Sequence, residues 1–418
     1  MTQTSYTPDP AVDGYSLRTA TPDDFEAAQL ALSEAFSEDW EDDALEAERG
    51  TYEPERTLLA VRGDEIAGVA CAFTRDLTVP GGIVPAAHVS WVGVRPTHRR
   101  RGLLTRMMRR QLADVRALGE PVAVLWASEG GIYQRFGYGL GASRLAMETD
   151  QAVRLLRAAE AGEGRLRSVR VAEAADMLSK VYDRVRADRV GWSSRDSRWW
   201  DSVLADPPSR REGRTAPRIT VHEGQSGVDG YAIWRIKPDW SWGGPKSTVM
   251  VREVVAANPD AYRALWRLLL DVDLTRSVQF GFAAADEPLY YLVNEPRKLG
   301  ARLLDGLWVR LVDLPAALAA RRYVAPVDVV LEVTDPVLAD NTGRWHLVGD
   351  AESASCTRTD RPADLALDVH ALAGAYLGGA ALASLGAAGR VTERAPGSLA
   401  RASVGFGWYR SPSATEVF

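Results

Sequence analysis

The chain has 418 residues, 46% hydrophobic and 25% charged, a composition typical of a folded protein that is too long for one core. At about 100–200 residues per domain, the length predicts two to four domains. Fifty Lys and Arg stand against 56 Asp and Glu, for a formal net charge of −6. This balance argues against a nucleic-acid-binding protein, whose binding domain is basic. It leaves room for a cationic substrate at a local acidic patch.

The two cysteines, Cys71 and Cys356, are too few for a disulfide framework, and neither lies at metal-ligand spacing from another Cys or His. We therefore expect no metal site. Residues 1–14 lack the basic and apolar regions of a signal peptide. The uncharged stretch 371–389 is too rich in Ala and Gly for a membrane span and predicts small-residue helices packed at close range. The expected location is cytoplasmic, with no membrane span.

Strands and helices alternate through the first 150 residues. Thr21-Pro22-Asp23-Asp24 supplies a helix start after a short first strand, and Gly63-Asp64 supplies a hairpin turn. The patterns predict strands at 15–18, 56–62, 65–77, 86–94 and 121–126, a helix at 102–118, and a short helix after the glycine turn 128–131. This order predicts a catalytic α/β domain over 1–150 with a partly parallel sheet.

Residues 151–312 repeat this plan and indicate an internal duplication. The patterns predict strands at 218–222, 231–240, 248–255 and 278–283 and a helix at 259–270. We expect Trp234, Trp240 and Trp242 to lie in the core of this second domain. A helix at 315–322 leads into a third domain, 313–418, with strands at 327–333 and 344–348.

One segment carries the clearest chemical signal. It reads Val92-Gly93-Val94-Arg95-Pro96-Thr97-His98-Arg99-Arg100-Arg101-Gly102-Leu103-Leu104-Thr105. A strand ends at Val94 and a helix opens at Gly102, where unpaired N–H groups and the helix dipole favour a phosphate. Gly102 leaves room for close approach, and Arg100 or Arg101 can add charge-assisted bonds. A solvated basic helix start is the alternative.

The same segment resembles the acyl-coenzyme A motif of the GNAT acetyltransferase superfamily. More narrowly, PTHRRRGLL at 96–104, SEGGIYQRFGYG at 128–139 and the three-domain plan resemble the enhanced intracellular survival family of N-acetyltransferases. The resemblance covers essentially the whole chain. It implies two tandem GNAT-like mixed-sheet domains followed by a sterol-carrier-like α+β domain, and a homo-oligomer, commonly a hexamer.

The resemblance also implies site residues. Val92, Gly93 and Val94 match the strand that pairs with the pantetheine arm of acetyl-coenzyme A. The pyrophosphate loop is matched by Arg100, Arg101, Gly102, Leu103, Leu104 and Thr105, and the second cofactor loop by Ser128 and Glu129. Tyr133 matches the general acid, and Phe418 matches the terminal residue whose α-carboxylate is the general base.

The chemistry requires such groups. A primary amine, with a pKa near ~10.4, must lose a proton before it attacks a thioester. A carboxylate with a reference pKa of ~3.3–3.7 becomes a better base when buried, and a phenol with a pKa of ~10 can protonate the leaving thiolate. The amine is itself the nucleophile, so no covalent enzyme intermediate is needed. The family suggests aminoglycosides, polyamines or lysine side chains as acceptors.

Other interpretations stay open at this point. In most proteins a tyrosine in the setting of Tyr133 is a packed aromatic on a short helix, and a chain end is normally frayed. The acidic run 37–43, with Trp40, is either a polycation-attracting loop or a solvated one; Glu38, Asp39 and Glu416 are candidates for steering a cationic acceptor. The second domain has no Arg-x-x-Gly before its helix and has Asp260 there instead, so we expect no coenzyme A in that copy. A non-catalytic coenzyme A- or lipid-binding scaffold is the alternative function.

Overall fold

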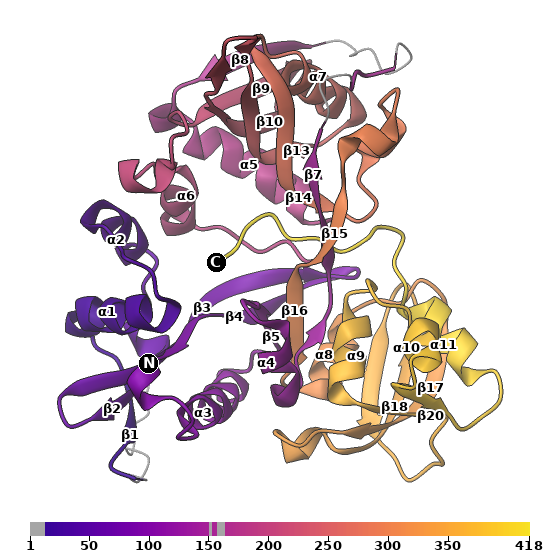
Figure 1. Ribbon diagram of the computed structural model, residues 1–418. Helices are drawn as coiled ribbons and strands as arrows, with labels where there is room; N and C mark the ends of the chain where they lie inside the picture. The colour runs from indigo at the N-terminus through magenta and orange to yellow at the C-terminus, as the bar shows by residue number, and fades with distance from the viewer. Residues whose placement is uncertain (1–12, 150–152, 157–163) are drawn as a thin grey trace.

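The computed structural model describes residues 13–149, 153–156 and 164–418. These form three lobes, seen in Figure 1 with the first at the lower left, the second at the top and the third at the lower right. Residues 1–12, which contain most of the segment judged to lack a signal peptide, lie outside the described residues, as does the predicted boundary at 150. Within the described ranges, no helix has both the length and the apolar character needed to cross a membrane.

The first lobe is built on a seven-stranded sheet with the order β1-β2-β3-β4-β5-β16-β6. All neighbours are antiparallel except β4 and β5, which run parallel. The strands are β1 (Ser16–Thr19), β2 (Thr57–Arg62), β3 (Glu65–Val79), β4 (Gly82–Val94), β5 (Val122–Trp126), β6 (Gly139–Leu140) and β16 (Leu307–Leu311). The helices are α1 (Phe25–Phe36), α2 (Asp42–Arg49), α3 (Leu103–Ala117) and α4 (Gly130–Tyr133).

The second lobe repeats this plan with the order β15-β7-β14-β13-β10-β9-β8, and its only parallel pair is β13 with β14. Its strands are β7 (Ser143–Glu148), β8 (Arg165–Val169), β9 (Arg218–Gly224), β10 (Gly227–Lys237), β13 (Ser247–Ala256), β14 (Thr275–Ala284) and β15 (Arg302–Asp305). Its helices are α5 (Ala175–Arg186), α6 (Ser197–Leu204) and α7 (Pro259–Leu270). In both sheets the parallel pair lies inside the sheet, between antiparallel neighbours.

The two sheets exchange strands across the predicted limits at 150 and 312. Strand β7 precedes residue 150 in sequence but pairs with β14 and β15 in the second sheet. Strand β16 follows the second lobe in sequence but lies between β5 and β6 in the first sheet. Chain segments therefore cross between the lobes in both directions, and they lie at the centre of Figure 1.

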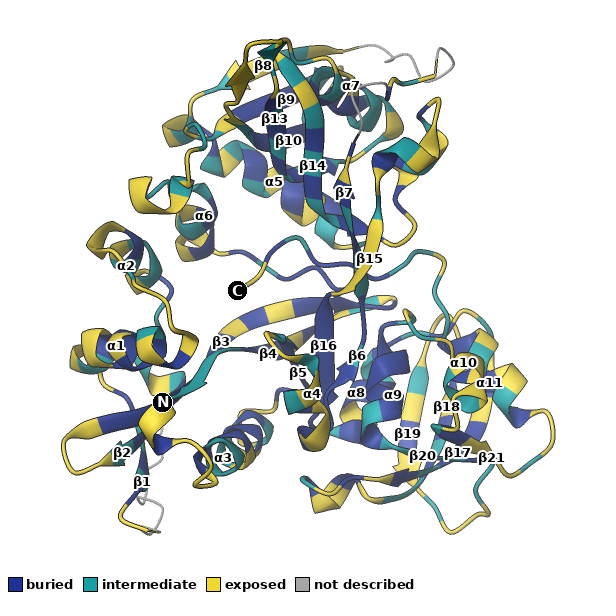
Figure 2. Cartoon of the chain, viewed as in Figure 1, coloured by how far each residue is buried: buried dark blue, intermediate teal, exposed yellow. Residues whose placement is uncertain are grey.

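The third lobe has a five-stranded sheet with the order β19-β18-β17-β20-β21. Its elements are α8 (Leu314–Ala320), β17 (Val327–Thr334), β18 (Gly343–Gly349), β19 (Ala354–Arg358), β20 (Leu365–Asp368), α9 (Val369–Tyr376), α10 (Leu382–Ala387), β21 (Val391–Glu393) and α11 (Ser398–Phe406). A fully buried ion pair between Arg310 of β16 and Asp335 (2.6 Å) joins this lobe to the first sheet. Buried residues concentrate along this junction, as Figure 2 shows for α8, α9 and β16.

The small-residue stretch behaves as predicted. It forms α9 and α10, and α9 lies so close to β6 that a Cβ added at Gly139 would fall 2.2 Å from the carbonyl oxygen of His370. Glycine is the residue that permits this approach between backbones.

The expectation for the tryptophans is wrong at two of three positions. Trp234 is buried, whereas Trp240 is 65% exposed and Trp242 is fully exposed. The reason is a short hairpin of β11 (Trp240–Ser241) and β12 (Gly244–Pro245), which forms a separate two-stranded sheet beyond the end of β10. A two-stranded hairpin has no second layer to cover its side chains.

Candidate active site

Strands β4 and β5 separate to form a wedge. They pair only from Ala86↔Val122 to Val89↔Leu125, while β4 stays paired with β3 as far as Gly68↔Val94. A β-bulge near Trp91, whose φ is +51°, bends β4 at the point where the pairing with β5 ends. Bulges of this kind bend a strand and terminate pairing. The segment with Val92, Gly93 and Val94 therefore has no strand partner on its β5 side.

Gly93 has a packing role within this segment. A Cβ at Gly93 would lie 2.9 Å from Ala35 of α1, so the glycine lets α1 pack directly against β4. The Val94 carbonyl accepts a hydrogen bond from Nε of Arg99 (3.2 Å), and Nη2 of Arg99 donates to the Ala35 carbonyl (2.7 Å). Arg99 thus fixes the loop that follows the strand.

The loop ends in an open helix N-terminus. Arg100 and Gly102 have left-handed φ values of +61° and +76°, and a Cβ at Gly102 would meet nothing within 4 Å. Gly102 caps α3 without a side-chain bond, so the first amides of the helix, those of Leu103, Leu104 and Thr105, lack intrahelical acceptors. The exposed Arg100 and Arg101 form no ion pair within the described residues. Only the backbone of Leu103 can face a ligand, because its side chain is buried in the core.

Helix α4 places the tyrosine beside the wedge. A Cβ at Gly130 would lie 2.9 Å from the ring of Trp308, so this glycine seats α4 on β16. Tyr133 is 7% exposed and packs edge-on against Tyr138, with ring centroids 6.0 Å apart. Burial raises the pKa of Tyr133 to about 12, so the phenol stays protonated at neutral pH. Ser128 and Glu129, just before α4, are both exposed.

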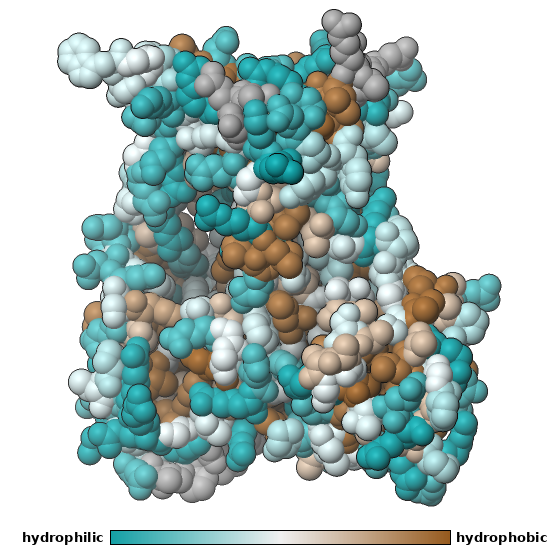
Figure 3. Space-filling view, turned by 45° about the vertical axis from the view of Figure 1, so that its right-hand side comes forward, coloured by the Kyte–Doolittle hydropathy of each residue, from teal (hydrophilic) through white to brown (hydrophobic). Residues whose placement is uncertain are grey.

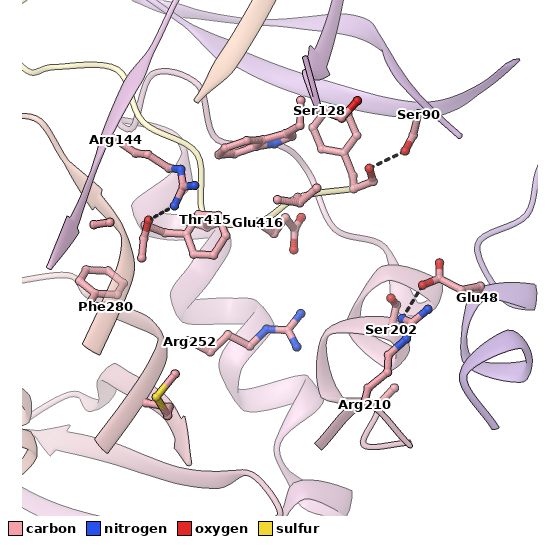
Figure 4. A pocket seen from close by; sticks show the side chains of 18 of the residues that line it. Glu48, Ser90, Ser128, Arg144, Ser202, Arg210, Arg252, Phe280, Thr415 and Glu416 are labelled. Atoms are coloured by element: carbon pink, nitrogen blue, oxygen red, sulfur yellow. Dashed lines mark hydrogen bonds and ion pairs between the residues drawn. The ribbon is translucent and has the colours of Figure 1, made fainter. Parts of the chain in front are cut away.

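The C-terminal tail returns from the third lobe to the centre of the molecule, between the first two lobes (Figure 1). The Ser413 amide donates to the Val190 carbonyl (3.0 Å), and Arg195 donates to the Thr415 hydroxyl (3.1 Å). The Ser90 hydroxyl donates to the main-chain oxygen of Phe418 (2.6 Å), and the dashed line at Ser90 in Figure 4 marks this bond. The chain end is held at the β4 residue where β4 leaves β5.

The ring of Phe418 is held as well. It contacts the ring of His88 edge-on at 4.7 Å. His88 is fully buried between the Ser193 hydroxyl (2.7 Å) and the Ala86 carbonyl (3.0 Å). Burial, with the nearby Arg75 charge, lowers the pKa of His88 well below its usual value, so this imidazole is neutral.

Glu416 is a structural anchor, which corrects its candidacy for steering a cationic acceptor. Its carboxylate binds Arg75 of β3 (2.6 Å) and Arg195 of the second lobe (2.9 Å), and the residue is 8% exposed. Burial alone would raise the pKa of Glu416, but the charges of Arg195 and Arg75 outweigh it and lower the pKa to about 2. The negative charge of Glu416 is therefore balanced by two arginines of the protein itself.

One cavity of about 1140 Å³ brings several predicted residues together: Val92, Ser128, Tyr133 and Phe418 all line it. Residues of the first two lobes line it. Figure 3 shows one face of the molecule, with apolar side chains beside polar ones at its waist. Of the acidic run, Glu38 and Trp40 line the cavity and Asp39 does not. Gly93, Val94, Glu129 and the loop residues 100–105 lie outside this lining.

The second lobe supplies the other wall of this cavity. The sequence analysis expected such a wall but did not predict its residues. Aromatic side chains line it on both sides, and guanidinium groups are numerous. On the second-lobe side these residues are Trp199, Phe280, Phe282, Arg144, Arg210, Arg214, Arg235, Arg252 and Arg302, and on the first-lobe side the aromatic residues are Phe36, Trp40, Phe73, Trp91, Trp126 and Tyr133. Several charges are already paired, for example Arg210 with Glu48 (2.6 Å), drawn in Figure 4. Within the described residues, no group of three or more His, Cys, Asp or Glu side chains is arranged to hold a metal ion.

The second copy of the wedge is closed. Strands β13 and β14 pair only as far as Val251↔Phe280, as β4 and β5 do in the first lobe. Ser413 and Thr415 of the tail lie beside these strands and line the small cavity that remains there. At the start of α7, the Asn258 side chain accepts from the Ala261 amide, so a residue of the chain itself caps this helix.

Comparisons with known proteins agree with this architecture. Two protein-family models described as "Acetyltransferase (GNAT) domain" match residues 16–141 and 191–311, and one described as "Sterol carrier protein domain" matches 314–414. The chain is thus an N-acetyltransferase with two GNAT domains and a sterol-carrier-like domain.

Similar proteins show which family of acetyltransferases the chain belongs to. An "Uncharacterized N-acetyltransferase" of Streptomyces avermitilis is 47% identical over 356 residues, 85% of this chain and 87% of the relative. "N-acetyltransferase Eis" of Mycobacterium bovis is 34% identical over 409 residues, 94% of this chain and 96% of the relative. The crystal structure of Eis1 from Mycobacterium abscessus superposes with a TM-score of 0.83 at 33% identity, covering 96% of this chain and all of the other. The chain belongs to the Eis family of N-acetyltransferases.

Removal of the Glu416 charge is expected to release the tail. In Glu416→Gln, Arg75 and Arg195 lose their shared carboxylate, and breaking a buried ion pair costs about 3–5 kcal/mol. A carboxypeptidase should then remove Phe418 at least about tenfold faster, which needs only about 1.4 kcal/mol of that cost. Mass spectrometry of a digestion time course measures the rate, with the exposed Glu352→Gln as control; equal rates in both variants would contradict the anchor.

The same anchor has a defined pH dependence. The pKa of Glu416 falls from 4.5 to about 2 on folding, so its stabilising contribution is complete above pH 4.5 and is lost as the pH falls toward 2. Release of Phe418 by an acid-stable carboxypeptidase should therefore stay constant from pH 7 to 5 and rise only below this window.

Proposed function

We propose that this enzyme transfers an acetyl group from acetyl-coenzyme A directly to an amine, with Tyr133 as general acid and the α-carboxylate of Phe418 as general base. The observation that carries the proposal is that both residues line the cavity beside the separated ends of β4 and β5. The proposed acceptors are small molecules or peptides with primary amines, of the aminoglycoside, polyamine or lysine type.

The residues present fit acetyl-coenzyme A, the acyl donor that GNAT acetyltransferases use. The unpaired side of β4 at Val92, Gly93 and Val94 accepts an extended pantetheine arm as an added strand. The amides at Gly102, Leu103, Leu104 and Thr105, with the charges of Arg100 and Arg101, suit the pyrophosphate. Ser128 and Glu129 lie at the end of β5, on the other side of the wedge.

The proposed transfer balances as follows. The carboxylate of Phe418, directly or through a water molecule, takes a proton from the ammonium form of the acceptor, and the free amine attacks the thioester carbonyl carbon. The carbon–sulfur bond then breaks, and the Tyr133 hydroxyl protonates the departing thiolate. The acetylated nitrogen gives its remaining extra proton to the Tyr133 phenolate, directly or through water, and the carboxylic acid of Phe418 releases the first proton to solvent. Charge on the carbonyl oxygen is stabilised by a backbone amide near Val92. The products are the acetylated amine and free coenzyme A.

The alternative of a non-catalytic scaffold is set aside, because the chain belongs to a family of N-acetyltransferases. The hexamer that the resemblance implies stays a prediction.

Tyr133→Phe is expected to lower kcat by about 10²- to 10⁴-fold, the usual contribution of a positioned general acid. Tyr138→Phe is the matched control, because Tyr138 packs against Tyr133 and its buried hydroxyl has no hydrogen-bond partner among the described residues. The rate of thiol release from acetyl-coenzyme A with an amine panel measures both. A Tyr133→Phe enzyme as active as Tyr138→Phe would refute the assignment.

Extension of the chain by Gly-Ser beyond Phe418 should lower kcat by a similar factor, about 10²-fold or more, because the carboxylate then leaves the Ser90 hydroxyl. Phe418→Leu is the control, since it keeps an apolar last residue and the carboxylate in place. The same thiol assay reports both. An extended chain that works at the wild-type rate would exclude a terminal general base.

Gly102→Ala should weaken coenzyme A binding by about tenfold or more, because the added methyl group projects into the space assigned to the pyrophosphate. Gly119→Ala is the control: its φ is also +76° and its Cβ would also meet open space, so both variants carry the same backbone strain. Isothermal titration with coenzyme A separates ligand contact from strain. Equal affinities in the two variants would argue against the assigned loop.

A further inference from the structure

Arg252 occupies an unusual position in the second lobe. The register of β10 and β13 runs from Ile233↔Glu253 directly to Trp234↔Val251, so Arg252 is the extra residue of a β-bulge. A bulge re-aims the side chain that it carries. Figure 4 shows the Arg252 guanidinium pointing into the open space of the large cavity, which Arg252 lines.

Within the described residues, the carboxylates whose charges act on Arg252, those of Glu416 and Glu253, are both bound by other groups. Glu416 is bound by Arg75 and Arg195, and Glu253 is bound by Arg195 (2.6 Å) and by the Tyr231 hydroxyl. Arg252 forms neither a hydrogen bond nor an ion pair within the described residues. Three guanidinium groups, those of Arg75, Arg195 and Arg252, therefore share two carboxylates.

The surplus charge is maintained at neutral pH. Burial lowers the pKa of Arg252, but a guanidinium remains protonated far above neutrality. Arg252 is only partly exposed, and a partly buried charge without a counter-ion is unfavourable.

The rest of this wall adds positive charge. Within the described part of the chain, Arg144 donates to the carbonyl groups of Gly281 (2.6 Å) and Asp305 (3.3 Å) and to no carboxylate. Arg302 forms no ion pair within the described residues. From the second lobe, three arginines without an ion-pair partner among the described residues (Arg144, Arg252 and Arg302) and one carboxylate, that of Glu148, line the cavity; Glu38, Glu48 and Glu416 line it elsewhere.

We propose that the acceptor amine carries an oxyanion, a carboxylate or a phosphate, and that Arg252 binds it. The inference rests on the proposed function and deepens it, because it selects among acceptor classes. A guanidinium binds an oxyanion through two parallel hydrogen bonds, and the aromatic side chains of the cavity shield this pair from water. Amino acids and acidic peptides fit this wall, whereas polyamines and aminoglycosides bring further positive charge to it.

The test compares amines that differ only in the oxyanion. The pairs are 6-aminohexanoate with pentylamine, 4-aminobutyrate with propylamine, phenylalanine with phenethylamine, and O-phosphoethanolamine with ethanolamine. In the wild type, kcat/KM for thiol release should be at least about tenfold higher for the anionic member of the best pair. The carboxylate and phosphate pairs show which oxyanion the site prefers.

The variants assign this preference to one side chain. Arg252→Gln should remove the preference, lowering kcat/KM about tenfold for the anionic amine and less than about threefold for its neutral partner. Arg252→Lys should restore part of it, because it keeps the charge without the planar fork. Arg214→Gln is the control, since Arg214 lines the same cavity but is paired with Glu212 (2.8 Å).

A second measurement does not require turnover of the anionic amine. Hexanoate, which has the oxyanion but no amine, should inhibit pentylamine acetylation competitively in the wild type and not in Arg252→Gln. The melting temperature of Arg252→Gln should equal or exceed that of the wild type, because the substitution removes an uncompensated charge.

The outcomes separate the two claims. Equal kcat/KM within every pair, or a preference that survives in Arg252→Gln, overturns the role of Arg252 and leaves the acetyltransferase proposal standing. Absence of thiol release with any amine, neutral or anionic, overturns the proposed amine acetylation and this inference with it.

Discussion

The site depends on one buried ion-pair network, in which Glu416 binds Arg75 and Arg195. The three residues come from three lobes, and Arg75 and Glu416 are 341 positions apart in the chain. Both guanidinium groups also lie over aromatic rings, Arg75 over Trp199 (4.1 Å) and Arg195 over Tyr182 (4.0 Å), which fixes their planes. Without this network the last two residues have no buried ion pair to hold them at the wedge.

Duplication explains why the network lies where it does. Both GNAT domains contain a parallel strand pair that separates beside a β-bulge, at Trp91 in the first and at Arg252 in the second. In the first copy the separation leaves an unpaired strand edge next to an open helix N-terminus. In the second copy the tail lies beside the separated strands and Asn258 caps the helix. The tail therefore passes along the second copy and ends at the separated strands of the first.

Much of the fold was predictable from local sequence patterns. The helix expected at 259–270 is α7, and the strand expected at 86–94 lies within β4, because turn residues and apolar spacing are local signals. The exchange of β7 and β16 was not predictable, since pairing partners of strands are set by contacts across long sequence separation. The prediction that Trp240 and Trp242 lie in the core was wrong for a related reason. Their hairpin is separate from the main sheet, and composition does not indicate where a sheet ends.

The site, like the fold, was only partly predictable from the sequence. Tyr133 and Phe418 were named only through family resemblance, and it is the fold that brings them to one cavity. The sequence analysis did not predict the ion-pair network of Glu416, Arg75 and Arg195, nor a role for Arg252. Each of these residues is, by sequence, an ordinary charged residue. Glu416 was noticed, but its partners were unknown, and a carboxylate with two buried guanidinium partners does the opposite of attracting a cation.

Burial also shapes the acid–base chemistry of the proposed transfer. A phenol whose pKa is raised to about 12 is a weak acid for a thiolate of ordinary basicity, near ~8.5. A thiolate formed in the wedge between β4 and β5 with water excluded is not ordinary, because the same loss of water disfavours its charge. This protein provides the comparison: burial raises the pKa of the Cys71 thiol to about 12 as well. The pKa values of the phenol and the departing thiol are therefore similar only when both groups are shielded from water. Proton transfer is most efficient between groups of similar pKa. The proposed acid step therefore requires that water be excluded around Tyr133 and the departing thiolate once the substrates are bound.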